Sequence, residues 1–244
     1  MKNICLTLTL LSFTALYAQD EIETAPDQYE NPSPAPKGLF QIESRFTVQD
    51  NGSGSHSLVL PSTNWKYGVN KNLEVLLVTD LVFDKTPDSI TKGLQPIKLG
   101  LKVKLWDGND GLLPDAALSM HISLPKLASK GWQATYFAPN LRLLLKNKIT
   151  EKIGVGFNFG GIWDGETPEA QFFYSCSPKY KLSQKLECFI ESYGYLRSTT
   201  NWIDGGLMYL ITNDIQAELS GGYELSATNG SHSYFGLAGL AFRI

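Results

Sequence analysis

Apolar and polar residues alternate strictly along most of the chain beyond residue 38. In the segment IQAELSGGYEL, Ile215, Ala217 and Leu219 fall on one face, and Gln216 and Glu218 fall on the other. The segments FQIESRFTV, PIKLGLKVKLW and IGVGFNFGGIW show the same period of two residues. Alternation over such lengths predicts β-strands, and no comparable period of about 3.6 residues indicates helices.

A short sequence frame recurs between these segments. YGVNKNLEV begins at Tyr67, YKLSQKLEC at Tyr180 and YLITNDIQA at Tyr209, and NKITEKIGV is a looser copy from Asn147. Each copy joins two apolar-face residues through turn-forming residues, so we interpret it as a tight turn between strands. With WDGNDGLL as a further turn and longer polar connections at the opposite end, the pattern predicts about twelve strands. The expected strands are roughly 39–48, 57–68, 73–83, 94–106, 112–124, 133–146, 153–163, 169–181, 186–196, 201–211, 215–226 and 232–243.

The polar faces of these strands carry many Lys, Arg, Asp and Glu residues, which need water or one another as partners. A soluble sandwich could not bury such faces. A closed antiparallel transmembrane β-barrel, with a polar lumen and an apolar exterior, satisfies both sets of side chains. We therefore predict an all-β barrel of about twelve strands, with short turns at one end and modest loops at the other.

The first residues predict export. Lys2, an apolar run from Ile4, and the small residues Ala15 and Ala18 indicate a signal peptide of residues 1–18. Residues 19–37 are acidic and rich in proline, which predicts a periplasmic leader that is extended or mobile. Whether this leader plugs the barrel is open at this point. Residues 38–244 form the expected barrel, which places the chain in the bacterial outer membrane, with its lipid as a partner.

Composition narrows the function further. The formal net charge is −3 and charged residues make up 18% of the chain, below the roughly 25% of soluble domains. There is no basic block of the kind that neutralises nucleic-acid phosphates, so no nucleic-acid partner is expected. On a shared hairpin, Cys188 would lie opposite Tyr180 or its neighbour. That is about four residues, or ~13 Å, from Cys176, which predicts free thiols because a disulfide needs Cα atoms within ~7 Å.

The charged side chains on the polar faces are the expected lining of the lumen. The candidates for a solute path are Arg45, Lys66, Lys98, Lys102, Lys104, Arg142, Glu187, Glu191, Glu218 and Glu224. Basic residues dominate the first half and acidic residues the second, which predicts ion pairs across the lumen, such as Arg142 with Glu218 and Lys102 with Glu191. These pairs would either stiffen a sealed barrel or polarise a passage. Tyr67, Tyr180 and Tyr209, just before short turns, are expected to form an aromatic girdle at one membrane interface.

The sequence offers little for catalysis or metal binding. His56, His121 and His232 are far apart and have no metal-ligand spacing, so no metal or cofactor is expected. His121 shares a strand face with Ser119 and Ser123, which suggests a nucleophile and base, but no third, orienting group is apparent. We expect no enzyme. A barrel enzyme acting on membrane lipids and a structural barrel with a sealed lumen are the alternatives to a channel.

Several segments carry a resemblance to a known family. ETAPDQYENPSPAPKGLFQIES, YGVNKNLEV and FGLAGLAFRI are similar to the outer-membrane transporters of the MetA-pathway of phenol degradation, which are distantly similar to long-chain fatty-acid transporters. The resemblance implies a channel or transporter for small solutes, of aromatic or hydrophobic character. The aromatic last strand, with Phe242, implies recognition by the barrel-assembly machinery. The family often has an acidic-Arg-Pro-Asp run where this chain has TAPDQYE, so no role for that Arg carries over.

Overall fold

The computed structural model describes residues 21–109, 113–196, 200–226 and 231–244, so the predicted signal peptide lies outside the described residues. Long antiparallel strands dominate this part of the chain, and a single turn of 3-10 helix, η1 (Lys130–Trp132), lies in one connection. Within the described residues, no helix is long and apolar enough to cross a membrane.

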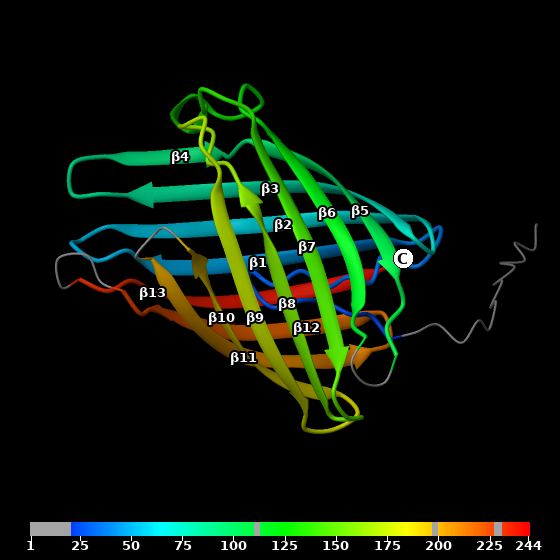
Figure 1. The fold of residues 1–244 in the computed structure, drawn as a ribbon. Coiled ribbons are helices and arrows are strands. Elements are labelled where there is room, and N and C mark those ends of the chain that lie inside the picture. The colour runs from blue at the N-terminus through cyan, green and yellow to red at the C-terminus, as the bar shows by residue number, and fades with distance from the viewer. Residues whose placement is uncertain (1–20, 110–112, 197–199, 227–230) are drawn as a thin grey trace, which may run out of the picture.

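Long strands follow one another around a closed barrel (Figure 1). They are β1 (Phe40–Asp50), β2 (His56–Asn70), β3 (Leu73–Lys85), β5 (Ile97–Trp106), β6 (Asp115–Leu124), β7 (Ala138–Lys148), β8 (Ile153–Ile162), β9 (Gln171–Lys181), β10 (Leu186–Tyr195), β11 (Asn201–Thr212), β12 (Ile215–Glu224) and β13 (Tyr234–Arg243). Each pairs antiparallel with its neighbours along the chain, and β1 pairs with β13 from Gln41–Arg243 to Asp50–Tyr234. The predicted closed antiparallel barrel is confirmed.

One additional strand, β4 (Ile90–Leu94), was not predicted. The sequence indicated a loop there because DKTPDSITKG is polar and contains a proline. In the structure β5 pairs with β3 only between Leu73 and Val78. The chain therefore folds back as β4 and pairs with Leu81–Lys85, which satisfies backbone groups that β5 leaves open.

The two ends of the barrel differ in the length of their connections. We call the end with residues 71–72, 107–109, 113–114, 149–152, 182–185 and 213–214 the turn end, and the end with residues 51–55, 125–137, 163–170, 196, 200, 225–226 and 231–233 the loop end. The barrel begins and finishes at the turn end, where the backbone N–H of Phe40 donates to the carbonyl of Ile244 over 2.8 Å.

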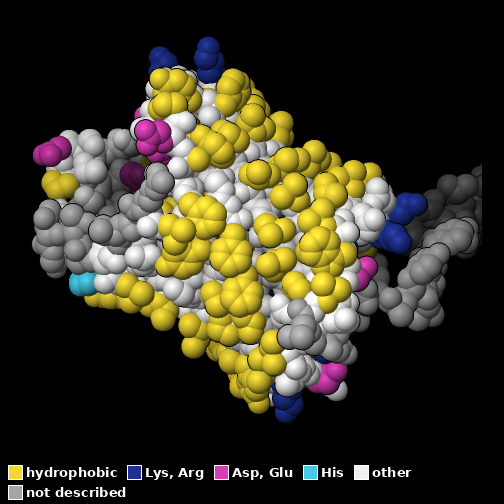
Figure 2. Space-filling model, in the orientation of Figure 1, with side chains coloured by type: hydrophobic (Ala, Val, Ile, Leu, Met, Phe, Trp, Pro, Cys, Tyr) yellow, Lys and Arg dark blue, Asp and Glu magenta, His cyan; other side chains and the backbone are white. Residues whose placement is uncertain are grey.

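The apolar faces of the strands point outward. Leu101 and Leu219 are 41% and 64% exposed, whereas their neighbours Lys102 and Glu218 are 1% and 8% exposed. Figure 2 shows apolar side chains covering the outer face of the barrel in this view, with charged groups gathered at its ends. Apolar side chains are exposed and charged side chains are buried, which is the reverse of a soluble protein and is what a lipid-facing surface requires.

The hairpin of β9 and β10 settles the relation between the cysteines. Cys188 lies opposite Tyr180 and Cys176 lies opposite Ser192, so the two residues sit in different rows of the hairpin, as the spacing predicted. Both cysteines are free.

We expect Leu219→Lys to lower the free energy of unfolding by about 2–4 kcal/mol, because it places a charge on the lipid face near the middle of a strand. The measurement is urea unfolding in lipid vesicles. Gln184→Lys, in an exposed turn, is the matched control and should have little effect. Equal unfolding midpoints for the two variants would mean that Leu219 does not face lipid.

Candidate functional site: the lumen and its N-terminal segment

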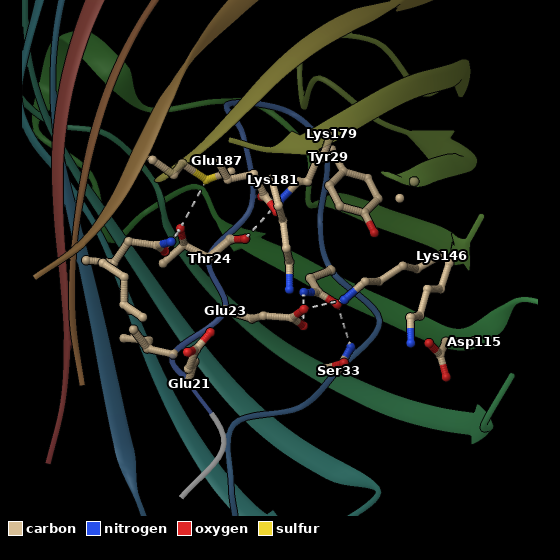
Figure 3. Close-up of a pocket in the computed structure, with 18 of the residues that line it drawn as sticks. Glu21, Glu23, Thr24, Tyr29, Ser33, Asp115, Lys146, Lys179, Lys181 and Glu187 are labelled. Carbon is tan, nitrogen blue, oxygen red and sulfur yellow. Dashed lines mark hydrogen bonds and ion pairs between the residues drawn. The ribbon is translucent and has the colours of Figure 1, made fainter. Parts of the chain in front are cut away.

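Residues 21–37, which we call the luminal loop, enter and leave the barrel at the turn end. The backbone N–H of Ile22 donates to the carbonyl of Asn213 in a turn-end connection. Further along, Lys37 forms an isolated bridge with Gly68, again close to the turn end. Between these points the segment reaches the middle of the strands and returns, and its trace runs inside the wall of strands (Figure 3).

The sequence left open whether this segment plugs the barrel, and the structure places residues 21–37 inside it. Ile22, Thr24 and Tyr29 are all buried in the lumen. The composition correctly indicated a segment that has no core of its own. It gave no sign that a polar lumen would supply partners for the segment, and its prolines also leave fewer backbone N–H groups to satisfy there.

The middle of the luminal loop is held by side chains from three strands. The N–H of Gln28 donates to Oε2 of Glu191 over 3.1 Å, and the N–H of Glu30 donates to Oδ1 of Asn158 over 2.6 Å. Arg142 donates from Nη1 to the Gln28 carbonyl over 2.9 Å. Glu191 and Asn158 are both 0% exposed, so the lumen is filled at this level.

The carboxylate of Glu30 lies in a cluster on β5 and β6. Lys102 Nζ lies 3.3 Å from Oε1, and the hydroxyl of Ser119 donates to the same oxygen over 3.1 Å. His121 Nε2 lies 3.8 Å from Oε2. Lys102 also pairs with Glu74 at 3.3 Å, so this buried ammonium group lies between two carboxylates.

Further polar contacts join the two limbs of the luminal loop. The side chain of Asn31 donates to Oε2 of Glu23 over 2.6 Å, and Lys146 forms an ion pair with Oε1 of Glu23. Partial loss of water around the half-exposed Glu23 side chain raises its pKa, but the charge of Lys146 and hydrogen bonds from Lys146 and Asn31 outweigh this effect and hold the pKa at about 2. Glu23 is therefore ionised at neutral pH.

Two glycines in the wall have no side chain and so allow the luminal loop to pack directly against the strands. A Cβ atom at Gly156 would lie 2.3 Å from the ring of Tyr29, and one at Gly68 would lie 2.2 Å from the carbonyl oxygen of Pro36. Both distances are well inside van der Waals contact. Any larger residue at either position would require the luminal loop to move.

Beneath the luminal loop lies a cavity of about 740 Å³, which we call the turn-end cavity. Lysines line much of it: Lys66, Lys102, Lys104, Lys146, Lys148, Lys152, Lys179, Lys181 and Lys185. Figure 3 shows Lys146 and Lys181 directed toward Glu23 of the luminal loop. Tyr29 also lines the cavity, and its hydroxyl is buried without a hydrogen-bond partner among the described residues.

Comparison with known proteins places this arrangement in a family. The family model described as "Putative MetA-pathway of phenol degradation" matches residues 25–244. The chain belongs to this family. The match begins within the luminal loop and runs through every strand of the barrel. A search of curated proteins finds no match.

Solved structures share the fold of this MetA-pathway family member. The COG4313 outer membrane channel from Pseudomonas putida F1 is 12% identical, with a TM-score of 0.66 and coverage of 91% of this chain and 100% of that one. The KdgM porin is 9% identical, with a TM-score of 0.56 over 83% of this chain and 98% of that one. The NanC porin is 11% identical, with a TM-score of 0.54 over 82% and 98%. Identities this low show the fold alone.

In this MetA-pathway family member, the predicted lumen charges pair mainly with adjacent strands. Such pairs are Lys66–Glu43 at 2.5 Å, Lys98–Asp80 at 2.9 Å and Lys179–Glu187 at 3.4 Å, and Lys104 pairs with Asp107 in the following turn. Arg45 reaches Glu218 at 3.2 Å across β13, where Gly239 lies in the same row and leaves room. Glu224 lies at the loop end of β12, opposite Trp202.

The expected pairs across the lumen are wrong. Arg142 contacts the luminal loop where Glu218 was expected, and Glu218 pairs with Arg45. Lys102 pairs with Glu74 and Glu30, whereas Glu191 accepts a hydrogen bond from Gln28. The luminal loop lies between the two walls, so it takes the place of the direct contacts.

The three tyrosines expected at a membrane interface lie near the turn end. Tyr180 and Tyr209 are 42% and 48% exposed. Tyr67 is half-buried because its ring packs against Phe40, with ring centroids 4.6 Å apart. These positions suit an interfacial girdle, whose contact with lipid headgroups stays a prediction.

Aromatic residues near the loop end form a feature that the sequence analysis missed. Phe173 packs against Tyr195 at 5.8 Å, Tyr193 stacks on Trp202 at 6.3 Å, and Trp202 packs against Phe235 at 5.9 Å between ring centroids. These side chains share a face with the inward Ser175, Glu191 and Asp204 by strand alternation. The sequence could have revealed these residues, because each is an aromatic residue at a position that strand alternation assigns to the polar face.

The geometry of Ser119 and His121 does not form a catalytic triad. Ser119 Oγ lies 3.0 Å from His121 Nε2, and Glu30, which the sequence did not suggest, approaches that same nitrogen. A triad needs the carboxylate on the other ring nitrogen, where it would orient the base. Among the described residues, no group of His, Cys, Asp or Glu could hold a metal ion.

We expect a double-mutant cycle on Glu43→Gln and Lys66→Met to give a coupling energy of about 0.5–3 kcal/mol, because the two groups are buried and in contact. A second cycle on Arg142→Met and Glu218→Gln should be additive within about 0.5 kcal/mol. Unfolding in denaturant provides both measurements. Strong coupling in the second cycle would restore the model of direct pairs across the lumen.

Proposed function

We propose that the chain is an outer-membrane channel for small solutes, that the luminal loop closes it, and that it opens when this loop leaves the lumen. The turn end faces the periplasm in this proposal, as the short turns of such barrels do. One observation carries it: a segment that belongs to no strand of the wall fills a closed, polar lumen through hydrogen bonds and ion pairs.

The way the luminal loop is attached favours a channel over a sealed structural barrel. Every strand of the wall pairs with two neighbours, and the luminal loop adds only the Lys37–Gly68 bridge to this network. Its other contacts are mainly hydrogen bonds and ion pairs, beside a small apolar cluster of Ile22 with Leu210 and Ala241. Hydrogen bonds contribute about 0.5–1.5 kcal/mol each net, or about 1.5–3 kcal/mol where one group is charged. The segment can therefore leave while the wall stays intact. Lumen water can then satisfy the groups that it uncovers.

Two observations support small aromatic or hydrophobic solutes as the cargo. The aromatic side chains near the loop end, among them Tyr193, Trp202 and Phe235, would offer ring faces to a solute that enters from that side. The family to which the chain belongs is described by a pathway of phenol degradation. Insertion into the membrane would use the C-terminal strand β13, which carries Phe242 near its end.

A lipid-hydrolysing barrel is the less favoured function. Ser119 is 1% exposed and its hydroxyl contacts Glu30 inside the barrel, whereas membrane lipids surround the outer face. A lipid substrate would have no route to this hydroxyl.

Deletion of residues 19–36 should raise the single-channel conductance in planar bilayers severalfold, because it removes the segment that fills the middle of the lumen. The shortened protein should still form a heat-resistant barrel on gels. A correctly folded, shortened barrel that conducts no better than the full chain would overturn the channel proposal in favour of a sealed barrel.

Gly156→Ala in the full chain tests the same idea without shortening the protein. The new methyl group would collide with the Tyr29 ring, so we expect longer or more frequent openings. Gly154→Ala is the matched control on the same face of β8, since its Cβ would meet only the Asn147 carbonyl oxygen, at an ordinary 3.6 Å. Equal gating in the two variants would mean that the fit of Tyr29 does not hold the channel closed.

A further inference from the structure

The carboxylate of Glu30 occupies a site that the barrel wall builds. Three wall side chains converge on it: Lys102 at 3.3 Å, Ser119 at 3.1 Å and His121 at 3.8 Å. Lys102 and Ser119 are each 1% exposed, so the site is a buried one. Glu30 itself comes from the luminal loop and is not part of the wall.

The wall holds these groups in place independently of Glu30. Lys102 on β5 and Ser119 on β6 are direct partners in the strand register. Glu74, opposite Lys102 on β3, fixes the ammonium group from the other side at 3.3 Å. The hydroxyl of Ser119 lies 3.0 Å from His121 Nε2. The donors therefore stay together when the luminal loop leaves.

Departure of the luminal loop would change the charge balance of this wall. Lys102 would lose one of its two carboxylates, and Lys146 would lose Glu23. Arg142 would lose the carbonyl of Gln28. A buried or confined cation that loses its partner is unfavourable, so these groups would attract a replacement anion.

We propose that this cluster of Lys102, Ser119 and His121 binds the carboxylate group of a small organic acid, and that Glu30 is the internal group that competes with it. This inference rests on the proposed channel function and names an acidic class of solute for it. A carboxylate suits the site because an ammonium group and a hydroxyl make charge-assisted hydrogen bonds to its oxygens. Exchange of one carboxylate for another leaves Lys102 paired throughout.

The test uses the full chain with Glu30→Ala, which removes the internal carboxylate and keeps the luminal loop. Benzoate is the probe and benzamide is its neutral counterpart of similar size and shape, with binding measured by titration calorimetry in detergent. We expect benzoate to bind Glu30→Ala at least tenfold more tightly than it binds the unaltered chain, and benzamide to bind neither. Heat resistance on gels reports that each variant is folded.

Two substitutions on the Glu30→Ala background locate the site. Ser119→Ala should weaken benzoate binding about tenfold, because it removes one hydrogen bond to a charged group. Ser123→Ala, on the same face of β6, is the control and should leave binding unchanged. Equal binding of benzoate and benzamide, or equal effects of the two serine substitutions, would overturn the inference.

The binding assay is independent of conduction. A barrel that conducts after deletion of residues 19–36 but shows no preference for benzoate would refute the carboxylate site and leave the channel proposal standing. A barrel that binds benzoate through Ser119 but never conducts would refute the channel proposal and leave the carboxylate site standing.

Discussion

The structure depends on one constraint: in lipid, every backbone N–H and C=O group must find its partner within the protein. The chain meets this constraint by pairing its first barrel strand with its last, from Gln41–Arg243 to Asp50–Tyr234. Once the sheet is closed, strand alternation sends one set of side chains to lipid and the other to the lumen. The exposed Leu219 beside the buried Glu218 follows directly from this closure.

Closure then creates a second requirement inside the barrel, because the inward side chains include many charges in a confined space. Part of this charge is matched by strand register, which brings Lys66 to Glu43 and Lys98 to Asp80 on adjacent strands. Further charge is matched by the luminal loop, which supplies Glu30 to Lys102 and Glu23 to Lys146. The N-terminal segment is therefore an electrostatic component of the lumen as well as a steric one.

The same contacts are the basis of the proposal that the segment can leave the lumen. It packs closely at Gly156 and Gly68, where the wall has no side chain, but it shares no extended strand ladder with the barrel. Most of its attachment consists of hydrogen bonds and ion pairs that water or a solute could replace, beside the apolar contact of Ile22 with Leu210 and Ala241. In the proposed function, this segment closes the lumen and the wall folds without it. The lysine-rich turn-end cavity beneath it provides a chamber on the side from which the segment enters.

The barrel could be predicted from the sequence alone, since the period of two residues fixes which side chains share a face. It also located the turns at Tyr67, Tyr180 and Tyr209 and the inward position of residues such as Lys102 and Glu191. These features are local, because they depend on alternation and turn chemistry within a few residues. The strand β4 escaped prediction because it depends on which part of β3 the distant β5 leaves unpaired. The partners of the charges and the place of residues 21–37 could not be predicted in this way. Those outcomes depend on contacts between residues far apart in the chain, such as Glu30 with Ser119, and on the space inside the closed barrel.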